Sequence, residues 1–170
     1  MNRPNLRPAR ILPAVGVALL SLAADAATKA WALSALRDGH RITLAGDLVR
    51  FQLVANHGAA FGIGARYEPL IVAVSVAGMV LLGLWALYAT SSAERAGAAL
   101  AAGGAAGNLA DRLARPLGGL HGAVIDWIHV SFYGPTFNLA DVWLRGGIVL
   151  AAAAWLWEHR SRPTEPTRPG

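Results

Sequence analysis

The feature that most constrains this chain is residues 69–90, a stretch of 22 residues without a charged side chain. As an α-helix it would reach roughly 33 Å, enough to cross the hydrocarbon core of a bilayer. Pro69 at its start suits the first turn of a helix. Apolar stretches of similar length occupy residues 11–36 and 139–158, and residues 94–114 form a fourth segment rich in Gly and Ala. The sequence therefore predicts four transmembrane helices.

The composition supports a membrane protein and excludes several other classes. Hydrophobic residues make up 55% of the chain and charged residues 15%, whereas a soluble domain carries about 25% charged residues. The basic residues do not form a patch with interleaved aromatic rings, so no nucleic-acid partner is expected. The chain has no cysteine, which excludes disulfides and thiolate chemistry. No metal site or cofactor is predicted, since His121 and His129 lack an H-E-x-x-H context.

The segments between the apolar stretches predict little regular structure except one hairpin. Residues 41–44 and 48–54 are rich in β-branched and apolar side chains and are separated by Ala-Gly-Asp, which favours a short β-hairpin at the membrane surface. Residues 115–138 contain several Pro and Gly and are predicted to be a loop. The chain then divides into a cytoplasmic arm (1–10), a single four-helix membrane domain (11–158) and a disordered cytoplasmic tail (159–170).

The orientation follows from the arginines. Three of them lie in the first ten residues, which favours a cytoplasmic N-terminus, and four crossings then return the C-terminus to the same side. A different interpretation is that the basic arm and the apolar run up to residues 24–26 form a cleavable secretory signal peptide. We favour a retained helix because the apolar run continues past Lys29 to Leu36, which is longer than the apolar core of a signal peptide.

In this topology the polar side chains of the predicted helices converge near the outer surface. An ionised side chain near the bilayer centre costs on the order of 3 kcal/mol, so such groups are candidates for a functional role. Asp25 and Lys29 have the i, i+4 spacing of an ion pair, and we favour a structural role for them. The other members of the group are Asn56, Asn108, Asp111, Arg112, Asp126, Asn138 and Asp141.

Most of these groups also have a simpler explanation. Asn138 and Asp141 fit a helix N-cap with an acid at the third helical position. Asn56 and its neighbour Gly58 fit a turn. The spacing G-x-x-x-G at residues 103–107 indicates close helix packing. The polar trio Asn108, Asp111 and Arg112 fits either the cap of a helix end or the floor of a binding site.

None of these explanations accounts for Asp126, which lies between Ile125 and Trp127, 15 residues before Asp141. A carboxylate in apolar surroundings is costly unless it is paired, hydrogen-bonded or protonated. Two neighbouring carboxylates cannot both ionise cheaply, so one keeps a proton while the other acts as a base on water. That pair would hydrolyse a peptide bond without a metal ion or a covalent intermediate.

The chain resembles the bacterial lipoprotein signal peptidases (signal peptidase II) over residues 11–158. The motifs that carry the resemblance are D-A-A-T-K at 25–29, N-H-G-A-A-F-G at 56–62, G-G-A-A-G-N-L-A-D-R at 103–112, V-I-D-W-I at 124–128 and F-N-L-A-D at 137–141. The resemblance implies an aspartic endopeptidase of the inner membrane, an all-α membrane protein with four transmembrane helices and a small periplasmic β-hairpin or cradle. Its active site would lie near the periplasmic face.

The resemblance also implies partners and residue roles. The family removes the signal peptide from prolipoproteins, cutting before a Cys that carries a diacylglyceryl group, and it is inhibited by the peptide antibiotic globomycin; membrane lipid is a further partner. By motif position, the catalytic pair is Asp126 and Asp141, and Asn56 and Arg112 face the substrate. The supporting residues are Asn108, Asp111, Asn138, Asp25 and Lys29.

One segment departs from the family pattern, and two other classes of protein stay open. Residues 113–125 are longer than expected and carry extra Pro and Gly, which leaves the shape of the outer loop undetermined. A non-catalytic scaffold or transporter subunit would use the polar cluster for structure only, and a related protein could bind lipoproteins without cutting them. Asp126 argues against a scaffold, which needs no second carboxylate near Asp141.

Overall fold

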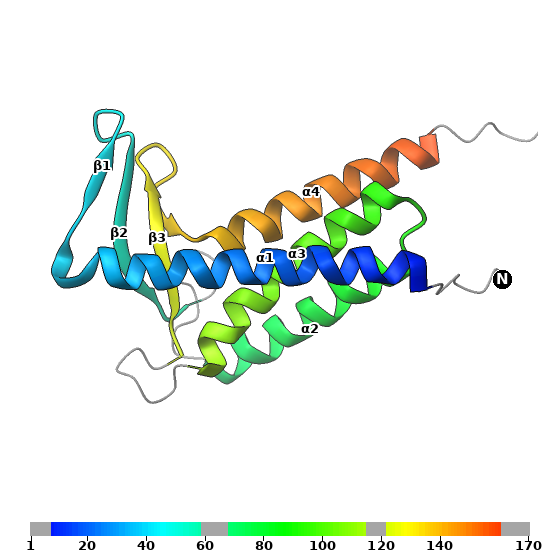
Figure 1. Cartoon of the computed structure of the whole chain (residues 1–170), viewed down its shortest axis with the longest axis horizontal. Helices are drawn as coiled ribbons and strands as arrows, with labels where there is room; N and C mark the ends of the chain where they lie inside the picture. The colour runs from blue at the N-terminus through cyan, green and yellow to red at the C-terminus, as the bar shows by residue number, and fades with distance from the viewer. Residues whose placement is uncertain (1–7, 59–67, 115–121, 161–170) are drawn as a thin grey trace, which may run out of the picture.

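The computed structural model describes residues 8–58, 68–114 and 122–160. Its helices run along the long axis of the molecule, and its strands gather at one end, which we call the sheet end (Figure 1). The elements are α1 (Pro8–Ala35), a short 3-10 helix (Arg37–Gly39), β1 (Ile42–Leu44), β2 (Val49–Asn56), α2 (Glu68–Tyr88), α3 (Ser92–Ala114), β3 (Val124–Val130), β4 (Thr136–Phe137) and α4 (Leu139–Arg160).

The strands form one antiparallel sheet in the order β1-β2-β3-β4. The predicted hairpin is confirmed as β1 and β2, with Thr43 opposite Arg50. The prediction that residues 115–138 form only a loop is wrong, because they contain β3 and β4. The physical reason is that β3, rich in β-branched and aromatic residues, finds its partner far away in the sequence, with Asp126 opposite Val54 of β2. The protein is therefore a mostly helical bundle with a four-stranded sheet.

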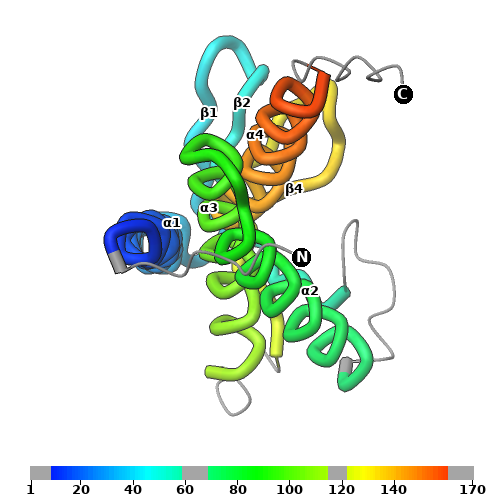
Figure 2. Tube along the Cα trace, turned by 90° about the vertical axis from the view of Figure 1, so that its right-hand side faces the viewer, coloured from blue at the N-terminus to red at the C-terminus, as the bar shows by residue number. Residues whose placement is uncertain are grey.

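Helix α3 packs against each of the other three long helices and lies among them when the molecule is viewed along the bundle (Figure 2). Glycine makes this close packing possible. A Cβ atom on Gly107 would lie 2.5 Å from Oδ2 of Asp25, and one on Gly104 would lie 2.5 Å from the carbonyl oxygen of Ala140. Gly103 faces α1 in the same way, against Ala18. The predicted close packing through G-x-x-x-G is confirmed.

Three helices of the described chain are long and apolar enough to cross a membrane: Ala9–Ala35, Pro69–Tyr88 and Leu139–Arg160. Helix α3 has 23 residues, enough for roughly 35 Å, yet it is composed mainly of small residues. The other helices enclose α3, and this explains why its composition differs from theirs. Small side chains allow close packing between helices, and an enclosed helix needs few long apolar side chains to face lipid.

An aromatic and aliphatic cluster fixes the sheet to α1. Trp127 of β3 packs with the buried residues Ala32 of α1 and Leu36, which directly follows that helix. Its ring meets the rings of Trp31 and Phe51 edge to face, with ring centres 5.2 Å apart in each pair. Because neighbouring side chains of a strand point to opposite faces, this packing directs the preceding residue, Asp126, to the other side of β3. Residues 1–7, 59–67, 115–121 and 161–170, with most of the predicted arm, outer loop and tail, lie outside the described residues.

Candidate functional site

The nine residues singled out from the sequence come from α1, β2, α3, β3, the start of α4 and the residue before it, and hydrogen bonds, ion pairs or a shared cavity bring them together. Five of them line a cavity of about 520 Å³: Asn56, Asn108, Arg112, Asp126 and Asp141. The remaining four, which are Asp25, Lys29, Asp111 and Asn138, are buried behind that wall. Three helices and the sheet therefore contribute to one polar cluster.

Asp126 lies in the middle of β3 with only 1% of its surface exposed. Both of its carboxylate oxygens accept hydrogen bonds from amide side chains. The Nδ2 atom of Asn138 donates to Oδ1 at 2.7 Å, and the Nδ2 atom of Asn56 donates to Oδ2 at 2.9 Å. Because these partners come from a different strand and from the start of α4, the carboxylate is held in one orientation.

Asp141 lies in the first turn of α4 and forms a capping box with Asn138. The backbone N–H of Asp141 donates to Oδ1 of Asn138 at 2.9 Å, and the backbone N–H of Asn138 donates to Oδ2 of Asp141 at 3.3 Å. The predicted N-cap is thus confirmed. The other oxygen of Asp141 accepts a hydrogen bond from Nδ2 of Asn108 at 3.0 Å. Asn138 and Asp141 therefore cap α4 and belong to the polar cluster at the same time.

Two amides connect the carboxylates. Besides its bond to Asp126, Nδ2 of Asn138 donates to Oδ1 of Asn108 at 3.0 Å. Asn108 donates in turn to Asp141. A chain of hydrogen bonds thus runs from Asp126 through Asn138 and Asn108 to Asp141, and it fixes the direction in which each amide group points.

A buried lysine stands behind this chain. Nζ of Lys29 lies 2.7 Å from Oδ2 of Asp25, 2.8 Å from Oδ2 of Asp111 and 3.2 Å from Oδ1 of Asn108. The predicted ion pair within α1 is confirmed and extends to α3. Asp25 also accepts from the backbone N–H of Ala140 at 2.9 Å, so the cluster ties α1 and α3 to the start of α4.

Arg112 and Asn56 form hydrogen bonds with the chain segments next to β2 and β3. The guanidinium of Arg112, which is 7% exposed, donates to the carbonyl oxygens of Gly122 and Gly58. The backbone N–H of Gly58 donates to Oδ1 of Asn56 at 3.0 Å, which is the turn predicted from the sequence. The side chain of Asn56 therefore joins this turn to Asp126.

The environment of Asp126 favours its protonated form. The pKa of this carboxyl group is raised to about 6; burial is the largest cause, and the nearby negative charge of Asp141 also acts to raise it. The amides of Asn56 and Asn138 and the positive charge of Lys29 act in the opposite direction, because they stabilise the ionised carboxylate. A proton near neutral pH is therefore available at this position, next to a second carboxylate.

The rest of the cavity wall has an apolar part, which α2 supplies. It also includes residues that were not predicted from the sequence. Helix α2 contributes Leu70, Ile71, Val74 and Leu82. The residues missed include Arg145, one helical turn after Asp141; an arginine inside the apolar stretch 139–158 was the available signal. Tyr133, Pro135, Thr136 and Phe137 also line the cavity, and they were missed because the segment was predicted to be loop.

The arrangement suits proton transfer to and from water. It offers two carboxyl groups in the wall of one cavity, a raised pKa on one of them, and donors that hold both in place. Within the described ranges no three His, Cys, Asp or Glu side chains are grouped as metal ligands.

The chain is similar to known proteins in both sequence and fold. The family model described as "Signal peptidase (SPase) II" matches residues 17–157. A lipoprotein signal peptidase of Mycolicibacterium smegmatis is 35% identical, covering 96% of this chain and 71% of its own length. One from Bifidobacterium adolescentis is 38% identical, with 86% and 78% covered. A solved structure, titled as a bacterial membrane enzyme at 2.3 Å resolution, has a TM-score of 0.75 at 24% identity and covers 91% of this chain and 94% of its own, which bears on the fold alone.

Proposed function

Because this chain belongs to the signal peptidase II family, we propose that it is an aspartic endopeptidase that cuts prolipoproteins before a Cys carrying a diacylglyceryl group. The observation that carries the proposal is the pair Asp126 and Asp141, which line one cavity and are connected through two amide side chains. A purely structural cluster would not need an acid with a raised pKa that opens onto a cavity.

In the proposed mechanism the two acids have different tasks. Asp141, as a carboxylate, takes a proton from a water molecule while the water oxygen attacks the carbonyl carbon of the peptide bond. Asp126, protonated, gives its proton to the carbonyl oxygen, and a tetrahedral diol forms. The diol then collapses: protonated Asp141 gives its proton to the nitrogen, ionised Asp126 takes a proton from one diol hydroxyl, and the C–N bond breaks. The products are a new carboxyl end on the signal peptide and a free amino group on the Cys, and both acids return to their starting states. Bound substrate would displace water and raise the pKa of Asp126 further.

The shape and polarity of the cavity support a lipid-bearing substrate. Its α2 wall presents Leu70, Ile71 and Val74, apolar side chains next to which acyl chains or the apolar core of a signal peptide would be stable. The polar wall carries the two acids. A globomycin-type inhibitor would occupy the same cavity.

The placement in the membrane belongs to the same proposal. We infer that all four long helices span the inner membrane, α3 inside the bundle, with both termini cytoplasmic and the sheet end near the periplasmic face. The arginines of the N-terminal arm and the apolar surfaces of α1, α2 and α4 support this orientation. The division into arm (1–10), membrane domain (11–158) and tail (159–170) is part of the same proposal.

The test is cleavage of a diacylglyceryl-modified prolipoprotein by the purified protein in detergent. Asp126→Asn and Asp141→Asn should each lower the rate by about 10²–10⁴-fold, since each removes an acid while keeping the size of the side chain. The double variant should be little worse than either single variant, because the two acids act as a unit. Asp47→Asn, at an exposed carboxylate in the β1–β2 turn, is the matched control and should cut at the parental rate.

Three results would contradict the proposal in different ways. Near-parental activity of either single variant would exclude the two-carboxylate mechanism. Binding of the lipidated substrate by the parent without cleavage would favour a lipoprotein-binding relative. If the parent neither binds nor cuts, the structural scaffold becomes the better interpretation.

A further inference from the structure

Arg145 lies in the wall of the same cavity as the two acids and has no assigned task in the proposed mechanism. Its Nη1 atom donates to the hydroxyl of Tyr133 at 2.8 Å, and its Cζ atom lies 5.9 Å from the centre of that ring. Among the described residues, no carboxylate lies within ion-pair distance of Arg145. The residue is therefore a cation held by a neutral partner at the border of an apolar cavity.

The position of Arg145 makes its charge costly. It belongs to the apolar helix α4, which is long enough to cross a membrane, and an arginine within such a span costs up to about 3 kcal/mol near the centre. A guanidinium has five N–H donors, and the single hydroxyl of Tyr133 accepts only part of that capacity. The unused donors would gain from another acceptor supplied by a ligand in the cavity.

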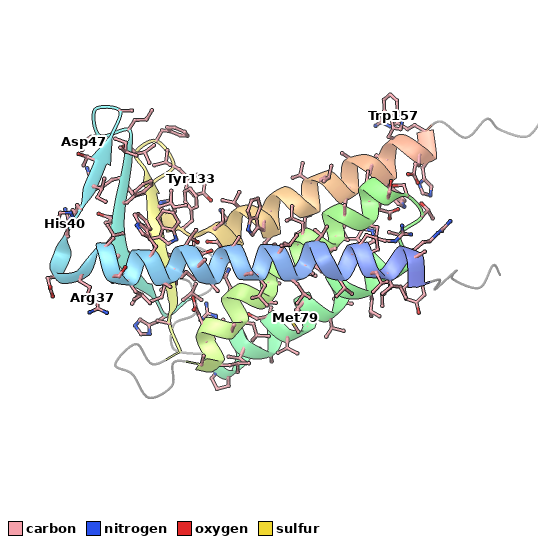
Figure 3. The ribbon with its side chains drawn as sticks, viewed as in Figure 1. Arg37, His40, Asp47, Met79, Tyr133 and Trp157 are labelled. Carbon is pink, nitrogen blue, oxygen red and sulfur yellow. The ribbon has the colours of Figure 1, made fainter. Side chains whose placement is uncertain are left out.

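Tyr133 fixes the direction of the arginine. Its ring meets Phe137 edge to face, with centres 5.6 Å apart, so it is anchored to β4. Figure 3 shows Tyr133 at the sheet end, beside the start of α4, whereas Trp157 lies at the opposite end of that helix. The hydroxyl of Tyr133 thus draws the guanidinium toward the level of the sheet.

The depth indicates what kind of acceptor would meet the guanidinium. Arg145 follows Asp141 by four residues, which is about 6 Å along a helix, so it lies just inside the apolar layer if the sheet end is at the surface. Charged phosphates stay in the headgroup layer above this depth. The ester carbonyls of a glycerolipid lie at the boundary with the hydrocarbon, and they are neutral acceptors that an arginine can bind.

We propose that Arg145, oriented by Tyr133, is a specificity residue that donates a hydrogen bond to an ester carbonyl of the diacylglyceryl group of the substrate. This inference rests on the proposed function, in which the cut bond adjoins the lipidated Cys. In that substrate the nearest ester carbonyl carbon is about six covalent bonds from the Cys Cα, a reach of roughly 6–8 Å at ordinary bond lengths. That reach is comparable with the spacing of Asp141 and Arg145 along α4.

The test removes the acceptor from the substrate and the donor from the protein. Two prolipoproteins of the same sequence and chain length are compared, one carrying ester-linked acyl chains and one carrying ether-linked alkyl chains, which have no carbonyl. The assay uses dodecyl maltoside micelles without added lipid, so that the substrate is the only source of ester groups. In the parent protein the ether substrate should have a KM about tenfold higher, with a similar kcat, as expected for loss of one charge-assisted hydrogen bond.

The variants decide whether Arg145 is responsible. Arg145→Gln should raise KM for the ester substrate about tenfold and leave the ether substrate nearly unchanged, which removes the preference. Tyr133→Phe, which keeps the ring and the arginine, should reduce the preference in part. Arg160→Gln, at the other end of α4, is the matched control and should keep the parental preference.

Two outcomes overturn the inference while leaving the proposed function intact. One is equal KM values for the ester and ether substrates in the parent, a comparison that needs no variant and so does not depend on variant folding. The other is an Arg145→Gln variant that loses activity on both substrates by the same factor, which would indicate a structural role. Failure of the parent to cut either substrate would overturn the proposed function together with this inference.

Discussion

Two helix N-caps in this protein begin with the same kind of hydrogen bond and have different surroundings; only the one at the start of α4 is a complete capping box, because the carboxylate of Glu94 accepts from the backbone N–H of Thr90 and not from that of Ser91. At the start of α3, the backbone N–H of Glu94 donates to the hydroxyl of Ser91 at 3.1 Å. At the start of α4, the backbone N–H of Asp141 donates to Oδ1 of Asn138 at 2.9 Å. In both cases an acid lies in the first turn of the helix, Glu94 in α3 and Asp141 in α4. One lies at the end of the bundle opposite the sheet and the other at the sheet end.

The difference lies in what the acid meets. Glu94 is 3% exposed and accepts from the indole of Trp85 at 2.8 Å and from the backbone and hydroxyl of Thr90 at 2.9 and 3.1 Å, all within nine residues of sequence. Asp141 instead opens onto the cavity, and its amide chain leads to Asp126 on another element. A capping acid saturated by local donors closes a turn, whereas one joined to distant elements and open to a cavity can do chemistry.

The largest expected effect concerns Lys29, the buried cation that contacts both Asp25 and Asp111. Lys29→Met should lower the free energy of unfolding by about 3–5 kcal/mol, because it removes the neutralising cation from two buried carboxylates, Asp25 and Asp111. Denaturant or thermal unfolding of the protein in detergent would measure this loss. No equivalent substitution can be made around Glu94 at the opposite end, because the described groups that donate hydrogen bonds to Glu94 are neutral.

A triple variant controls for the loss of packing. The triple variant adds Asp25→Asn and Asp111→Asn to Lys29→Met. It removes both carboxylate charges that Lys29 neutralises, so much of the lost stability should return. If Lys29→Met alone is as stable as the parent, the cluster is not held by charge and the contrast between the two ends disappears.

The long apolar helices and the cap at the start of α4 could be predicted from sequence because both are local. The length and apolarity of residues 69–90 suffice to identify α2, and the spacing of Asn138 and Asp141 suffices to identify the start of α4. The pair Asp25 and Lys29 is likewise local, at one helical turn. Positions of this kind need no knowledge of what packs against them.

The parts that were missed depend on contacts between distant segments. β3 was predicted to be loop because its partner β2 lies about 70 residues earlier, and pairing between them could not be inferred from Pro and Gly on either side. Arg145 was overlooked because its partner Tyr133 lies in that same misassigned segment. The hydrogen bond that Asn138 donates to Asn108 could not be predicted for the same reason. Motif order indicated which residues gather, and only the fold indicates how they are connected.

A smaller effect is expected at the opposite end. Glu94→Gln should lower the free energy of unfolding by about 1–3 kcal/mol. The amide NH₂ of the glutamine would replace one carboxylate oxygen and would face an N–H group that had donated a hydrogen bond to that oxygen. Its kcat/KM for the lipidated substrate should stay at the parental value at a temperature where the variant is folded. Unfolding and cleavage are measured on the same preparation. A large fall in kcat/KM without loss of stability would mean that the two ends are not functionally distinct.

The smallest expected effect is a shift in pH dependence at Asp126. The pKa of this carboxyl group is about 6, raised mainly by burial, and the amide of Asn56, which donates a hydrogen bond to it, keeps the pKa from rising higher. Removing the amide in Asn56→Ala therefore raises the pKa, by about one unit for one hydrogen bond to a charged group. The mechanism requires protonated Asp126, so activity is lost as pH rises through this pKa, and the alkaline limb of the kcat/KM profile should move upward by about one pH unit.

The control for this shift comes from the other cluster. Thr90→Val removes a hydroxyl that donates to Glu94, so it is the corresponding loss at the opposite end and should leave the pH profile where it is. Movement of the alkaline limb to lower pH in Asn56→Ala would mean that ionised Asp126 is the active form, and the tasks of the two acids would have to be exchanged. Equal shifts in both variants would show that the limb reports stability and not the titration of Asp126. Only a shift confined to Asn56→Ala assigns the limb to the carboxyl group that opens onto the cavity.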